Sequence, residues 1–232
     1  MNILSADAIL RLFAEGRRRS PLARTAMAIA AADGETAPLE LTAGELEARL
    51  LSIREATFGA SMEGVATCPA CGEACETVLR TTDVLALPPG HEPVAIEHGP
   101  WRVEARLPRG DDVASAMHLR DPDAIRAAIL ARCVIASNVD PLPPELMERV
   151  EEALAAADPR ADVRLALTCP ACAHEWQLRF DAVAFLWSEI GASSERLLED
   201  VDVLARAYGW SEQDILAMSA TRRALYVERI RS

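Results

Sequence analysis

The chain has 232 residues, half of them hydrophobic, and a formal net charge of −12. This length and composition allow a buried core in one large domain or two small ones, and they exclude an intrinsically disordered chain. The acidic balance disfavours a nucleic-acid surface, because such surfaces gain most of their affinity from Lys and Arg. The start of the chain is not typical of a signal peptide, and no apolar run of eighteen residues occurs. We therefore expect a cytoplasmic protein with no membrane contact.

Helical patterns and capping residues fill the first sixty residues. Ser5 is a helix cap and Gly16 a helix end, while Thr42 and Glu45 have the spacing of a capping box. The arginines at 17–19 are interpreted as the solvated end of the first helix. The three predicted helices are Ser5 to Gly16, Pro21 to Ala32, and Thr42 to just before Gly59. Residues 1–60 are therefore predicted to be an N-terminal helical segment.

Two identical Cys-Pro-Ala-Cys sequences follow, far apart in the chain. They place cysteines at Cys68 and Cys71 and again at Cys169 and Cys172. Each pair is spaced so that one tight turn directs both sulfurs to the same ion, and four thiolates complete a tetrahedral Zn²⁺ site. Strand-like residues flank both turns. The sequence therefore predicts one structural zinc and a zinc ribbon split between residues 61–87 and 160–180.

Other uses of these cysteines remain open. The two pairs are about a hundred residues apart, which is wider than in compact ribbons of roughly fifteen to twenty intervening residues. Disulfides or redox chemistry are alternatives, although a reducing compartment favours metal, and no helix N-terminus that would activate a redox thiol is predicted here. Cys75 and His174 are candidate substitute ligands. We expect Cys75 to pack beside the first turn and His174 to lie on the second.

An insert is predicted between the two halves of the ribbon, over residues 88–159. Alternating apolar residues at 94–96 and 101–107 around a turn indicate a β-hairpin. Asp121 and Pro122 begin a helix whose apolar stripe includes Cys133, which we expect in the core. A second helix carries apolar residues four apart, at Leu146, Val150 and Leu154.

The last part of the chain, residues 181–232, is predicted to be a helical subdomain. Its first helix begins at Ala182 and is expected to break at 191–194, before a second helix that Gly209 ends. Ser211 and Ser219 can cap two further helices. Trp187 is expected to pack the ribbon against these helices, and Trp210 to join the last pair. The fold class is α+β: a zinc ribbon flanked by helical segments, with a hairpin and helices inserted.

Several segments together resemble one family. They are Arg54 to Gly59 leading to Cys68–Gly72, Arg106 to Pro108, Arg132–Cys133, the second Cys-Pro-Ala-Cys with His174 and Trp176, Phe180–Asp181, Phe185 to Trp187, Glu189–Ile190, and Tyr208 to Glu212 through Arg222, Arg223 and Tyr226. The pattern is similar to the T4-like baseplate (hub assembly chaperone) family of contractile phage tails and extracellular contractile injection systems. The resemblance spans nearly the whole chain.

The resemblance implies a role in building or priming a baseplate, through contacts with baseplate or hub proteins, as a transient chaperone or a resident subunit. It implies no enzymatic activity. The residues themselves agree, since a zincin helix, a serine nucleophile elbow and a phosphate-binding glycine loop are all missing from the sequence. The alternative is a zinc-ribbon adaptor in transcription or RNA processing, which would require a basic or aromatic face on the ribbon. The acidic balance counts against that alternative.

Overall fold

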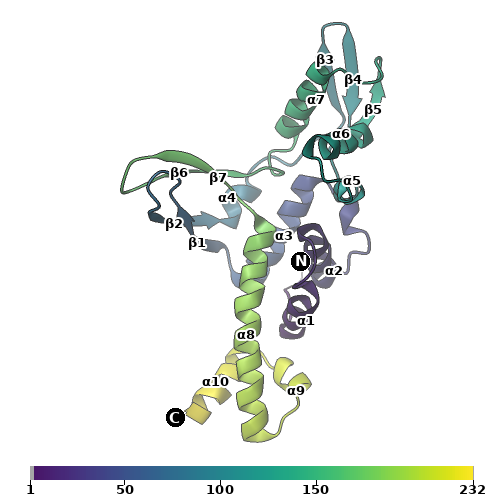
Figure 1. Cartoon of the computed structure of the whole chain (residues 1–232). Helices are drawn as coiled ribbons and strands as arrows, with labels where there is room; N and C mark the ends of the chain where they lie inside the picture. The colour runs from purple at the N-terminus through teal and green to yellow at the C-terminus, as the bar shows by residue number, and fades with distance from the viewer. Residues whose placement is uncertain (1–2, 232) are drawn as a thin grey trace.

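The computed structural model describes residues 3–231. Figure 1 shows a central helical body, a pair of β-hairpins that project from one side, a mixed helix and strand unit at one end, and a small helical tip at the other. The protein thus combines helices with antiparallel strands, as the α+β prediction required. No helix among the described residues is long and apolar enough to cross a membrane.

The body consists of the three N-terminal helices packed against the first half of a long helix. These elements are α1 (Ala6–Gly16), α2 (Pro21–Asp33), α3 (Ala43–Phe58) and α8 (Ala182–Tyr208). Ser5 and the capping box of Thr42 and Glu45 begin their helices as predicted. The largest buried side chains of this core include Ile29, Leu50 and Leu186. The core therefore joins the start of the chain to its last quarter.

Gly16 ends α1, as predicted, but its main contact is with Trp187. It is the last residue of α1, but the chain continues in right-handed helical geometry at Arg17, so no left-handed glycine cap forms. A Cβ at Gly16 would lie 2.5 Å from the ring of Trp187. The glycine is needed because an indole packs directly on the helix backbone. Trp187 consequently packs against α1, and the guanidinium of Arg24 of α2 lies over its ring. The sequence had suggested instead that it joins the cysteine-bearing hairpins to the C-terminal helices.

Helix α8 is continuous, which corrects the predicted break at 191–194. Gly191 keeps helical geometry, and a Cβ there would meet only Phe13 of α1, at 3.7 Å. Ser194 is fully buried within the helix and caps nothing. Packing against α1 outweighs the local preference of glycine and serine for a helix end, because burial of one face stabilises the whole length. The helix ends at Gly209, whose φ of 69° is left-handed, as predicted.

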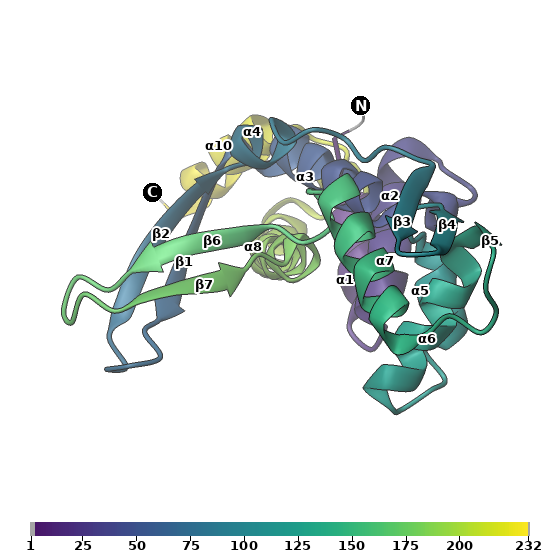
Figure 2. The same ribbon diagram turned by 90° about the horizontal axis from the view of Figure 1, so that it is seen from above.

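Two antiparallel hairpins leave the body side by side (Figure 2). The first is β1 (Ser61–Thr67) with β2 (Ala74–Arg80), followed by the short helix α4 (Thr81–Leu85). The second is β6 (Arg164–Thr168) with β7 (Glu175–Arg179). Each hairpin is its own two-stranded sheet. An isolated two-stranded hairpin is marginally stable in water, so each needs contacts at its far end.

The insert between the hairpins forms a separate core. Its elements are β3 (Val94–His98), β4 (Trp101–Ala105), α5 (Gly110–Ala116), α6 (Pro122–Cys133), β5 (Val134–Ser137) and α7 (Pro144–Ala157). The hairpin, the two helices and their buried faces match the prediction, with Cys133 fully buried. Helix α5 and strand β5 were not predicted. Strand β5 pairs with β4 across a bulge, so the sheet has three strands.

Two buried carboxylates organise the insert: Asp112 joins its segments to one another, and Asp158 joins its end to the body. Asp112 is fully buried and accepts hydrogen bonds from Arg106 (2.6 and 2.8 Å), Arg132 (2.7 Å) and the Arg109 backbone (2.9 Å). Burial alone would raise the pKa of Asp112, but these donors outweigh it and lower the pKa to about 2. Asp158, where the insert ends, accepts a 2.8 Å bond from the Gly44 N–H in the first turn of α3.

The tip consists of the second half of α8 with α9 (Glu212–Leu216) and α10 (Ala220–Arg231). Ser211 and Ser219 accept the capping hydrogen bonds predicted for them. Leu204, Ile215 and Val227 form a small core of their own. Only this half of α8 belongs to the tip, because its first half packs in the body. The predicted 181–232 subdomain therefore differs from the observed packing.

Candidate metal centre

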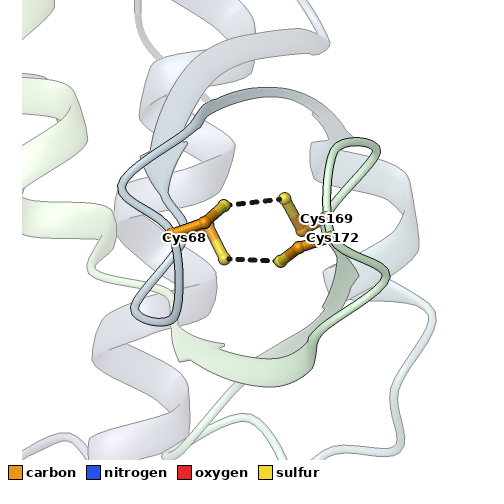
Figure 3. Close-up of side chains that lie close together, drawn as sticks. Cys68, Cys169 and Cys172 are labelled. Atoms are coloured by element: carbon orange, nitrogen blue, oxygen red, sulfur yellow. Dashed lines mark hydrogen bonds between the residues drawn. The ribbon is translucent and has the colours of Figure 1, made fainter.

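The two Cys-Pro-Ala-Cys turns meet at the far ends of the hairpins (Figure 3). The sulfur atoms of Cys68, Cys71, Cys169 and Cys172 all lie within 4.8 Å of one another. Two contacts join opposite hairpins: Cys68 Sγ lies 3.8 Å from Cys172 Sγ, and Cys71 Sγ lies 3.6 Å from Cys169 Sγ. The structure thus brings together all four residues that the sequence selected as metal ligands.

The spacing of the sulfur atoms fits a tetrahedral ion. Four thiolates around Zn²⁺ at a Zn–S distance of about 2.3 Å have an S to S separation of about 3.8 Å. A disulfide would instead require about 2.0 Å between sulfurs, and all six cysteines are free. The donor set and its geometry are therefore compatible with a structural metal site, with no open position at the metal.

The two turns have the same backbone geometry. In each, the N–H of the first cysteine donates to the carbonyl five residues later: Cys68 to Glu73 (2.8 Å) and Cys169 to His174 (2.9 Å). In each, the residue after the second cysteine donates back to the first cysteine at 2.9 Å. That residue is left-handed in both turns, with φ of 78° at Gly72 and 56° at Ala173. Ala173 adopts this conformation at a cost, because its Cβ crowds the following carbonyl.

Cys169 and Cys71, which face each other across the cluster, differ in how readily they ionise. Burial opposes ionisation of Cys169, but the backbone N–H groups of Cys172 and Ala171 and the neighbouring thiols outweigh it and lower its pKa to about 6. At Cys71, a backbone N–H from Glu73 favours the thiolate, yet the thiol contacts with Cys172 and desolvation prevail and raise the pKa to about 12. The thiolate is therefore favoured at Cys169 and opposed at Cys71. Metals are bound by thiolates rather than thiols, so metal binding must release protons.

The two substitute ligands considered from the sequence lie outside the four-sulfur group. Cys75 is buried against Cys68 and Cys169, where its thiol approaches the Glu73 carbonyl. The ring of His174 stacks on Trp176 at 6.1 Å, while its backbone closes the second turn. Both residues therefore pack around the cluster, as predicted. Cys133 lies in the core of the insert instead.

A buried arginine joins the base of the first hairpin to the body. Arg54 of α3 donates to the Glu189 carboxylate of α8 at 2.9 and 2.5 Å, and to the carbonyls of Gly59 and Ser61 at the entry to β1. Its side chain is only 5% exposed, and it lies over the ring of Phe185. Sequence patterns did not indicate this contact, because Arg54 and Glu189 are 135 positions apart. The only signal was that both belong to segments of the family resemblance.

A comparison of the chain with protein-family models, curated proteins and solved structures finds no match. The fold and the site by themselves define a protein of mixed helices and strands, in which four cysteines from two distant turns form a cluster compatible with a structural metal.

Proposed function

We propose that this protein is a non-enzymatic assembly factor or minor baseplate component of a contractile phage-tail-like injection system. It acts through contacts with baseplate or hub proteins. The observation that carries the proposal is that the segments resembling the baseplate family meet in space. Arg54 pairs with Glu189, Arg106 and Arg132 share one carboxylate, and the aromatic residues of the tail segment pack together. Segments that define one fold in this way support a resemblance of the whole protein.

The metal in this proposal is a zinc ion that stabilises the two hairpins. Four thiolates close its coordination shell, which leaves no position for a substrate or an activated water. The ion would fix the far ends of the two hairpins to each other. Its chemical contribution is cross-linking, and the chain's own residues provide the binding surfaces.

The proposal is tested by co-expression. The full chain is immobilised and presented with baseplate and hub proteins of a contractile tail, and in parallel with duplex DNA and RNA at physiological salt. Retention of at least one baseplate or hub protein, with no retention of nucleic acid, is the expected result. Binding to nucleic acid with no binding to a tail protein would overturn the proposal.

The second candidate is a zinc-ribbon adaptor in transcription or RNA processing. One observation favours it: the second hairpin exposes Arg164 and Arg179 at its base and carries the stacked pair of His174 and Trp176 toward its turn. Both arginines, however, already pair with Asp162. The outer face of the other hairpin is acidic and apolar, with Val65 and Val78 each 69% exposed among glutamates. The hairpin pair therefore lacks a continuous basic surface, and we rank this candidate second.

A further inference from the structure

One face of the last helix is exposed, cationic and apolar at once. Arg222, Leu225, Tyr226 and Arg229 of α10 follow the spacing i, i+3, i+4 and i+7, which places them on a single side of the helix. They line a shallow hollow together with Glu228, which has an interaction partner of its own. Leu225 is 62% exposed, the highest value among the large hydrophobic residues on the described helices. We call these four residues the α10 face.

The opposite side of α10 explains why this face is held outward. Arg223 and Val227 are buried against α8, and Arg223 pairs with Asp200 at 2.9 Å. Tyr226 is fixed at the edge of an aromatic cluster, in which its ring meets Trp210 at 4.9 Å and Tyr208 at 5.7 Å. The α10 face is therefore presented by a packed helix. A presented aromatic residue loses little conformational freedom on binding, which favours its use as an anchor.

The charges of the face indicate its partner. Within residues 3–231, neither Arg222 nor Arg229 forms an ion pair with a carboxylate, whereas Arg223 and Arg206 of the same tip do. Arg222 instead lies over the ring of Tyr226, at 5.9 Å. Two available guanidinium groups, seven residues and about 10 Å apart along the helix, thus flank an apolar centre. A complementary surface has two carboxylates around an apolar side chain.

We propose that the α10 face is a docking site for an acidic amphipathic segment of a partner protein. This deepens the proposed function and rests on it, since the segment would belong to a baseplate or hub protein. A nucleic acid is a poor occupant, because the chain has a net charge of −12 and the neighbouring helix α9 carries Glu212 and Asp214. A short segment can match the two arginines without approaching those carboxylates.

The first experiment tests the face without any tail protein. The probe is a synthetic amphipathic helical peptide with two glutamates seven residues apart around a leucine, and its twin carries lysines in place of the glutamates. The full chain is titrated with each while backbone amide resonances are recorded. We expect the acidic peptide to shift the resonances of residues 222–229 and to bind at least about tenfold more tightly than its twin. Equal binding of both peptides, or shifts elsewhere, would overturn the assignment.

The second experiment uses variants of the full chain. The double variant Arg222→Glu with Arg229→Glu, and separately Leu225→Ser, should each weaken peptide binding by about tenfold or more. The matched controls are Arg149→Glu on α7 and Ile135→Ser on β5, both exposed and remote. These controls should bind like the unmodified chain, and thermal unfolding checks that all variants fold. If the tip variants bind as well as the controls, the α10 face is not the site.

The same variants separate this inference from the proposed function. If baseplate or hub proteins bind the unmodified chain and all variants equally, the proposed function stands and the docking site is wrong. If no tail protein binds but the acidic peptide binds through residues 222–229, the α10 face is a docking site and the proposed baseplate function is wrong. A second copy of this chain is the remaining possible occupant, and sedimentation of the unmodified chain tests for it. If the chain forms a dimer that Leu225→Ser disrupts, the α10 face binds a second copy and the proposal is overturned.

Discussion

Removal of the metal is the perturbation whose effect follows most directly from the structure. Cys71 and Cys169, which face each other across the cluster, are 98 positions apart. A cross-link that closes a loop of this length lowers the entropy of the unfolded chain by the equivalent of about 4.7 kcal/mol at 25 °C. Removal of the metal also takes away the link between the far ends of the hairpins, and isolated two-stranded hairpins are only marginally stable. We therefore expect a strong chelator to lower the free energy of unfolding by on the order of 4 kcal/mol.

The assay is denaturant unfolding of the zinc-loaded and chelated protein, with bound metal measured by elemental analysis. Cys169→Ser should lose close to one metal equivalent and match the chelated protein. Cys75→Ala is the matched control, since it removes a buried thiol beside the cluster but no ligand, and it should retain one equivalent. A wild-type protein that carries no metal, or whose stability the chelator leaves unchanged, would refute the reasoning.

Three further predictions concern single positions. Ala173→Gly should stabilise the protein by about 0.5–1 kcal/mol, and Gly72→Ala should destabilise it by a similar amount, because the turns are alike and no atom lies within 4 Å of a Cβ at Gly72. Burial, and then a nearby aspartate, raise the pKa of Glu47 to about 7. Its stabilising contribution is full below about pH 4.5 and is lost as the pH rises through 7, so Glu47→Gln should raise the free energy of unfolding at pH 8 by up to about 3 kcal/mol. Gly44→Ala should destabilise the protein by about 2 kcal/mol or more, since its Cβ would lie 1.9 Å from Asp158 Oδ1.

Denaturant titrations check all three, and each has a result that contradicts it. The free energy of unfolding should rise in Ala173→Gly and fall in Gly72→Ala. If Gly72→Ala were more stable than wild type, the left-handed conformation would not be a source of strain in these turns. The difference in free energy of unfolding between Glu47→Gln and wild type must shrink as the pH falls toward 4.5. A difference that stays constant with pH would mean that the Glu47 carboxyl does not titrate as described. Normal stability of Gly44→Ala would show that the first turn of α3 and the end of α7 can separate freely.

Much of the fold follows from local sequence. Capping residues such as Ser5, Thr42 and Ser211 began helices where predicted, and the spacing of the four cysteines selected the cluster. These features succeed because each depends on residues a few positions apart. The cysteines needed one further assumption, that two identical turns converge.

The remainder depends on contacts that local patterns do not contain. Gly191 looks like a helix end until α1 is packed beside it, and Gly16 looks like a cap until Trp187 lies on it. Strand β5 is a short segment between a helix and a proline-rich loop, and only pairing with β4 makes it a strand. The buried ion pair of Arg54 with Glu189 likewise forms only when α3 packs against α8.

The continuity of α8 has a mechanical consequence. At 27 residues it is about 40 Å long, and its first half is fixed in the body while its second half carries the tip. A tilt of about 10° at the buried half would therefore displace the far end by about 7 Å, as a stiff rod transmits rotation into translation. Phe185 and Glu189, which contact Arg54 at the root of the first hairpin, lie on that buried half. The orientation of the hairpins and the position of the tip are thus coupled through one rigid element.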